Sequence, residues 1–77
     1  MAAESRQQTS RLSRLSERER QIAMLIARGL KNKDIAGELH ISENTVKRHL
    51  QSIFGKTGSH DRLELAVLAV TELNRAA

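Results

Sequence analysis

Apolar residues recur at intervals of three and four along most of this chain, which is the spacing of one face of an α-helix. The first such set is Ile22, Leu25 and Ile26. Ser16 stands three residues before Glu19, the arrangement of a capping box, in which each side chain bonds the backbone N–H of the other residue. Gly29 then offers the left-handed conformation at which helices end. These signals predict a first helix at residues 17–28.

Two further capping signals predict a short helix and a longer one. We expect Asn32 to cap a helix at residues 33–39, and Ser42 to cap a helix at residues 43–57 that ends at Gly58. The inward residues of the short helix are Ile35, Ala36 and Leu39. Those of the longer helix are Val46, Leu50, Ile53 and Phe54.

A fourth helix is predicted at residues 62–74, because Asp61 stands three residues before Glu64 in a second capping box. No stretch of alternating apolar and polar residues indicates a strand. The fold class is therefore all-α, a compact four-helix domain. Residues 1–14 hold almost no large apolar side chain and are expected to form a disordered tail or linker, which leaves residues 15–77 as the domain.

The composition excludes several classes of protein. The chain has 77 residues and no cysteine, so it is one small domain without disulfides or a cysteine-based zinc site. No catalytic set of side chains, glycine-rich phosphate loop or metal cluster can be assembled from it, and we expect no enzyme activity, no cofactor and no metal. No apolar run approaches the length of a membrane span. The sequence predicts a cytoplasmic protein that has no membrane partner.

Positive charge is concentrated on one segment. The formal net charge is +4, and no acidic residue occurs between Asn44 and His60, where Lys47, Arg48 and Lys56 lie. Such a segment is either a solvated basic helix face or a surface for a polyanion.

The chain between the second and third predicted helices indicates which of these it is. Only His40, Ile41 and Ser42 join the two helices, so they must cross steeply, with Ile41 at the corner. This is a helix-turn-helix, whose second helix enters the major groove of DNA. Amides and cations on the exposed face of that helix suit base edges, since Arg and Lys bond guanine and Asn and Gln bond adenine.

Four motifs in this region occur together. They are L-S-x-R-E at residues 15–19, A-x-G-L-x-N-K-x-I-A-x-x-L at 27–39, I-S-E-x-T-V-K-x-H at 41–49 and K-x-G at 56–58. Together they resemble the LuxR-type helix-turn-helix family, and the likeness continues through Arg62 into the last helix. The resemblance implies sequence-specific binding of double-stranded DNA by the effector domain of a bacterial transcriptional regulator, above all a two-component response regulator.

The resemblance also assigns roles to matching residues. Expected contacts to base edges are Lys47, Arg48, Gln51 and Val46. Expected contacts to phosphate are Lys31, Asn32, Lys33, Asn44, Thr45, His49 and Lys56. Three alternatives stay open. Val46 has the spacing of a core residue, and Thr45 is placed where it can support the cap of its own helix. Residues 31–33 can be explained by ordinary helix capping and solvation.

The fourth helix carries more apolar residues than a small core needs, which predicts a dimer interface. The candidates are Leu63, Val67, Leu68 and Val70. We expect a weak homodimer that forms mainly on DNA, with RNA polymerase as a further partner. The alternative is that these side chains cover the edges of the core or meet a neighbouring domain.

Two other classes of protein share features of this sequence, and one junction in it departs from the family pattern. The promoter-reading region of a sigma factor shares L-S-E-R-E and a helix-turn-helix, and a helical protein-binding module would also explain a basic face. Thr57 and Ser59 stand where the LuxR-type family has aliphatic residues, and Gly55 lies within the last helical turn. We therefore expect loose packing between the third and fourth helices.

Overall fold

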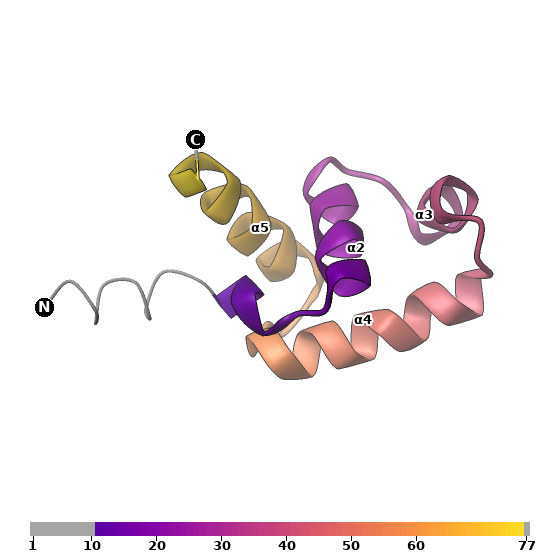
Figure 1. Cartoon of the computed structure of the whole chain (residues 1–77), viewed down its shortest axis with the longest axis horizontal. Helices are drawn as coiled ribbons and strands as arrows, with labels where there is room; N and C mark the ends of the chain where they lie inside the picture. Colours follow the sequence, from indigo (N-terminus) through magenta and orange to yellow (C-terminus); the bar gives the residue numbers. More distant parts are fainter. Residues whose placement is uncertain (1–10, 77) are drawn as a thin grey trace, which may run out of the picture.

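The structure, a computed structural model, describes residues 11–76 apart from the side chains of Leu73, Arg75 and Ala76. A short 3-10 helix, η1, at Arg11–Arg14 precedes four α-helices. These are α2 at Glu17–Ala27, α3 at Asn32–Leu39, α4 at Glu43–Thr57 and α5 at Arg62–Ala76 (Figure 1). Throughout this described part the chain is helix and connecting turn, which confirms the predicted all-α fold.

The ends of α2 and α4 form as the sequence predicts. Glu19 N donates to Ser16 Oγ at 3.1 Å while Ser16 N donates to Glu19 Oε1 at 2.8 Å, so the first capping box is confirmed. At the start of α4, Thr45 N donates to Ser42 Oγ at 3.0 Å. Gly58 ends α4 with a φ of 74°, in the left-handed region that a glycine enters without strain. Local capping chemistry therefore sets these boundaries.

The predicted cap of α3 is wrong. Asn32 lies inside the helix as its first residue, and the N-cap position belongs to Lys31. Lys31 N donates to Asp34 Oδ2 at 3.2 Å, because an aspartate three residues later can turn back to that N–H. The Asn32 amide is left for another partner, and its Oδ1 accepts from Arg62 Nη1 at 2.7 Å.

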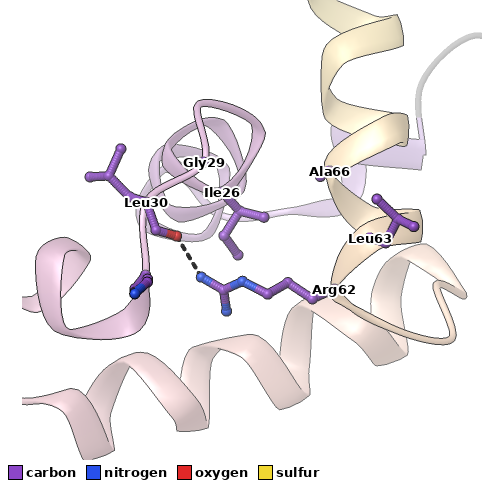
Figure 2. Close-up of a pocket in the computed structure, with 7 residues that line it drawn as sticks. Ile26, Gly29, Leu30, Arg62, Leu63 and Ala66 are labelled. Carbon is purple, nitrogen blue, oxygen red and sulfur yellow. Dashed lines mark hydrogen bonds between the residues drawn. The ribbon is translucent and has the colours of Figure 1, made fainter.

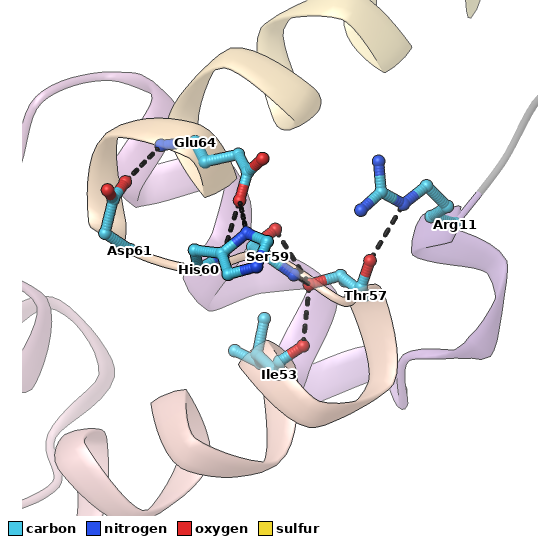
Figure 3. Close-up of polar contacts among 7 residues, drawn as sticks. All are labelled: Arg11, Ile53, Thr57, Ser59, His60, Asp61 and Glu64. Carbon is cyan, nitrogen blue, oxygen red and sulfur yellow. Dashed lines mark hydrogen bonds and ion pairs between the residues drawn. The ribbon is translucent and has the colours of Figure 1, made fainter.

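The second predicted capping box is half formed. Glu64 N donates to Asp61 Oδ1 at 2.8 Å, as expected. The Glu64 carboxylate does not return to Asp61 and instead accepts from the backbone N–H of His60 (Figure 3). This bond, with a weaker one from the His60 ring, lowers the pKa of Glu64.

The expected tail extends too far into the domain. Residues 1–10 lie outside the described residues, but residues 11–14 form η1, which packs against α4. Leu12 is only 1% exposed, and Arg11 Nε donates to Thr57 O at 2.8 Å. One buried leucine and one bond to the last turn of α4 therefore order a segment whose polar composition suggested disorder.

The core lies where α2 meets α4 and α5, while α3 packs against α4 at its other end (Figure 1). Its largest fully buried side chains are Leu12, Ile22, Ile35, Val46, Ile53 and Leu65. Leu65 and Ala69 of α5 are both fully buried and face the core from this helix. Every helix thus contributes aliphatic side chains to one continuous core.

The junction between α4 and α5 is not loosely packed, and that expectation is wrong. Thr57 is 3% exposed and Ser59 is 7% exposed. Thr57 Oγ1 donates to Ile53 O at 2.8 Å and lies 3.0 Å from Ser59 Oγ, and Ser59 N donates to Thr57 Oγ1 at 3.3 Å (Figure 3). Two hydroxyl groups that bond each other and the backbone fill the place of the aliphatic residues, at no cost in unpaired polar groups.

Candidate nucleic-acid interface

The connection between α3 and α4 has the geometry of a helix-turn-helix. His40 ends α3 in the left-handed conformation, with a φ of 59°, and Ile41 N donates to Ala36 O at 3.0 Å. Ile41 packs against the core, which confirms its place at the corner. In Figure 1, α3 is seen nearly end-on near the first turn of α4, and the axis of α4 lies close to the plane of the picture. The two helices therefore cross steeply, and one face of α4 points away from the other helices.

That outward face, which we term the recognition face, consists of Asn44, Lys47, Arg48 and Gln51. Their spacing of three and four residues places them on one side of the helix. All four are exposed, and within residues 11–76 none of their side chains has a hydrogen-bond or ion-pair partner. The face therefore presents two amides and two cations whose donors and acceptors face water.

Three neighbouring residues of α4 have less access to a ligand. Val46 has none of its surface exposed, so it belongs to the core and its predicted contact with a base edge is wrong. His49 is half-buried. Thr45 Oγ1 lies 2.9 Å from Ser42 Oγ, which places this hydroxyl in the local cap of the helix.

A second basic group lies at the start of α3. Lys31 and Lys33 are exposed on either side of Asn32, which is half-buried. The first backbone N–H groups of a helix lack partners within it and carry partial positive charge, so this turn attracts an anion. The arrangement suits a phosphate group beside the recognition face.

Lys56 is engaged inside the domain rather than toward a phosphate. Its Nζ lies 2.9 Å from Glu19 Oε1, and the Glu19 side chain is only 7% exposed. Glu19 Oε2 accepts from Ser52 Oγ at 2.7 Å, and Oε1 also accepts from Ser16 N. The buried carboxylate needs this cation, so the structure does not support the predicted phosphate contact of Lys56.

The bonds to Glu19 stabilise its charged form. The Ser16 N–H contributes most, followed by the Ser52 hydroxyl, with Lys56 adding a further bond and its charge, and together they lower the pKa of Glu19 from 4.5 to about 2. The sequence reveals only the Ser16 part of this cluster. Glu19 and Lys56 are 37 residues apart, and no local pattern connects them.

The match to a family model decides the identity of this helix-turn-helix. The model described as "Bacterial regulatory proteins, luxR family" matches residues 13–69. The chain belongs to the LuxR family. Its DNA-binding helix-turn-helix domain is the part that the structure describes, and the resemblance drawn from its motifs is confirmed.

Curated relatives of this LuxR-family domain are regulators. It is 43% identical over 58 residues to the transcriptional regulatory protein YdfI of Bacillus subtilis, covering 75% of this chain and 27% of the relative. It is 44% identical over 57 residues to a nitrate/nitrite response regulator protein homolog of Haemophilus influenzae, covering 74% and 27%. It is 42% identical over 55 residues to the response regulator protein VraR of Staphylococcus aureus, covering 71% and 26%. The matched part spans about a quarter of each relative. No solved structure matches.

The outer side of α5 is the main apolar surface of this LuxR-family domain. Leu63 is 73% exposed, Val67 57% and Val70 40%. Leu68 is different, because it is half-buried and packs against the core, and its role as a dimer contact stays a prediction. We term Leu63, Val67 and Val70 the α5 apolar patch.

Among residues 11–76, histidine and carboxylate side chains nowhere gather in a group that could hold a metal ion. No helix in the same range is both long and apolar enough to cross a bilayer.

Proposed function

We propose that this LuxR-family domain binds specific sequences of double-stranded DNA as the effector domain of a bacterial transcriptional regulator of the response-regulator type, acting in the cytoplasm. The observation that carries the proposal is the recognition face. It lies on the second helix of a helix-turn-helix and has no carboxylate, and its four polar side chains have no partner within the described residues. Polar groups of this kind, aligned on a helix that fits the major groove, match base edges.

Different residues serve affinity and specificity in this proposal. Lys47, Arg48 and Gln51 bond base edges from the recognition face. Asn44 and Thr45 at the start of α4, and Lys31 to Lys33 at the start of α3, bond phosphates and fix the register, with His49 as a half-buried phosphate donor. This division follows the roles that the resemblance to the LuxR-type family implies for the matching residues, with the phosphate contacts on the first turns of α3 and α4.

The regulator assignment is supported by the relatives. Two of the three named above are called response regulators, and the family match favours a regulator over a sigma factor or a protein-binding module. Contact with RNA polymerase follows from the role of a regulator and is part of the proposal.

Selection of binding sites from a random duplex library tests the readout. Arg48→Ala and Gln51→Ala should each lose preference at one or two base pairs, at about 1 to 3 kcal/mol. Lys33→Ala should instead weaken binding to all sequences and reduce the slope of log affinity against log salt by about one unit. Arg18→Ala, which removes an exposed arginine from α2, is the control. Unchanged preference in both recognition-face variants would refute the assignment.

We further propose that the α5 apolar patch joins two copies of the domain on DNA. The patch is small, so association should be weak in free solution and evident when two half-sites raise the local concentration. A duplex with two half-sites should therefore bind the wild type cooperatively and Val67→Asp without cooperativity. Gln21→Asp adds the same charge on α2 and should leave cooperativity intact. Independent loading of the half-sites by the wild type would contradict the dimer.

A further inference from the structure

Arg62, the first residue of α5, joins this helix to the start of α3. Its Nη2 donates to Leu30 O at 2.6 Å, and its Nη1 donates to Asn32 Oδ1 at 2.7 Å. Figure 2 shows the side chain reaching from α5 across an open groove to Leu30. The groove has a volume of about 400 Å³ and is lined largely by aliphatic side chains such as Ile26 and Leu63. Arg62 is thus a polar bridge between a helix that does not touch DNA in the proposed function and one that does.

The bond to Asn32 determines which way the amide faces. A guanidinium group has donors only, so it can bond the amide oxygen and would repel the amide NH2 group. With Oδ1 held by Arg62, the Nδ2 atom is directed away from the guanidinium. Within residues 11–76, Nδ2 has no acceptor. An NH2 group fixed in this way is a donor without an acceptor, between the exposed cations Lys31 and Lys33.

We propose that Arg62 is a positioning residue for DNA binding, which orients the Asn32 amide so that its NH2 group donates to a phosphate oxygen. The inference rests on the proposed function. Both Nη atoms of Arg62 bond the protein, and in this proposal the guanidinium acts through Asn32 and the Leu30 carbonyl rather than through a bond of its own to DNA. The advantage is preorganisation, because an amide that is free to rotate presents its oxygen to the phosphate as readily as its NH2 group.

A double-mutant cycle on DNA affinity tests the proposal. Fluorescence anisotropy would measure binding of the wild type, Arg62→Ala, Asn32→Ala and the double variant to a duplex selected by the wild-type domain. We expect Asn32→Ala to weaken binding about tenfold, since a hydrogen bond to a charged oxygen is lost. Arg62→Ala should weaken it about twofold, since the freed amide presents its NH2 group to the phosphate in only half of its orientations. The double variant should bind about as weakly as Asn32→Ala alone, because Arg62 acts through the amide. Additive losses, about twentyfold in the double variant, would overturn the inference.

The salt dependence separates positioning from direct contact. Arg62→Ala should leave the slope of log affinity against log salt unchanged, whereas Lys33→Ala should reduce it by about one unit. An equal reduction in Arg62→Ala would show that the guanidinium itself binds phosphate, which would overturn the inference.

A measurement on the wild type keeps the proposal testable if Arg62→Ala fails to fold. The side-chain NH2 resonance of Asn32, followed in a nitrogen-15 NMR spectrum, should shift when the duplex is added. An unshifted resonance with DNA bound would overturn the inference. If no duplex binds at any salt concentration, the proposed function itself fails, and this outcome is distinct from an additive cycle on DNA that does bind.

Discussion

The two halves of α4 use the same kinds of side chain for opposite purposes. In the first half, Asn44 and Lys47 are exposed and have no partner within residues 11–76. In the second half, Lys56 bonds the buried carboxylate of Glu19, and the Thr57 hydroxyl bonds the backbone and Ser59. The helix is continuous and similarly polar throughout. The difference comes from the rest of the chain, because Glu19 of α2, Arg11 of η1 and Ser59 after α4 place polar partners along its second half.

This comparison shows that a polar residue on a helix has no role of its own until its neighbours are known. A lysine beside a buried carboxylate stabilises the fold, and a lysine beside water is available to a ligand. We therefore expect changes of the partnered polar side chains in the second half to lower stability and spare DNA preference, and changes of the exposed polar side chains in the first half to do the reverse.

The largest effect on stability should come from Glu19→Gln. The change removes the ion pair with Lys56 and places an NH2 group against partners that donate, which costs about 3 kcal/mol of unfolding free energy. This is the lower end for a buried pair, since the Lys56 side chain is 42% exposed. Urea unfolding would measure it. Glu17→Gln makes the same change at an exposed position two residues away and should cost under about 0.5 kcal/mol. Equal losses of unfolding free energy in the two variants would contradict the stabilising role of the Glu19 carboxylate.

The same carboxylate should make stability fall in acid. The pKa of Glu19 is about 2 when folded, below its ordinary value of 4.5, so its contribution is present above pH 4.5 and is lost as the pH falls toward 2. The difference in unfolding free energy between wild type and Glu19→Gln should therefore be about 2 kcal/mol smaller at pH 3 than at pH 7. The lowered pKa of the exposed Glu64 acts in the same direction in both proteins. A difference that does not change with pH would contradict the assignment.

Thr57→Leu should destabilise the domain by about 2 kcal/mol, although the resemblance to the LuxR-type family implies an aliphatic residue at this position. The site is 3% exposed and already filled, and the substitution removes the bond to Ile53 O and a partner of Ser59. Thr57→Val keeps the shape, lacks the hydroxyl and should cost about 1 kcal/mol. Thermal unfolding would compare the three proteins. A higher melting temperature for Thr57→Leu would show that the polar junction is a weakness.

The smallest effect should come from Gly55→Ala, which is expected to stabilise the domain by about 0.5 to 1 kcal/mol without changing DNA affinity. Gly55 lies in the second half of α4, and an added Cβ would meet no atom within 4 Å. Gly58→Ala is the matched opposite. Its φ of 74° is left-handed and its Cβ would lie 3.4 Å from Arg11 Nη2, so it should lose about 1 kcal/mol. Similar melting temperatures for the two variants would contradict this account.

Local signals predicted the helices, and distant contacts determined what the polar residues do. The Ser16 and Ser42 caps, Gly58 and the apolar spacing were sufficient for the fold because each acts within one helical turn. The bond between Arg62 and Asn32 spans 30 residues, and no periodicity indicates it. The spacing of Val46 from Leu50 and Ile53 allowed a core position as well as a base contact, and its burial in line with these residues decides for the core. The contacts proposed for the recognition face stay predictions.

The cluster around Glu19 also has a genetic consequence. One carboxylate bonds Ser52 and Lys56 from α4, so a substitution at position 19 changes what is tolerated at positions 52 and 56. A neutral residue at position 19 leaves an ammonium group with no counter-charge, and a second mutation that replaces Lys56 with an uncharged residue should restore part of the lost stability. Revertants of a Glu19 mutant are therefore expected at position 56 more often than elsewhere. Substitutions at positions 19, 52 and 56 should also occur together rather than singly.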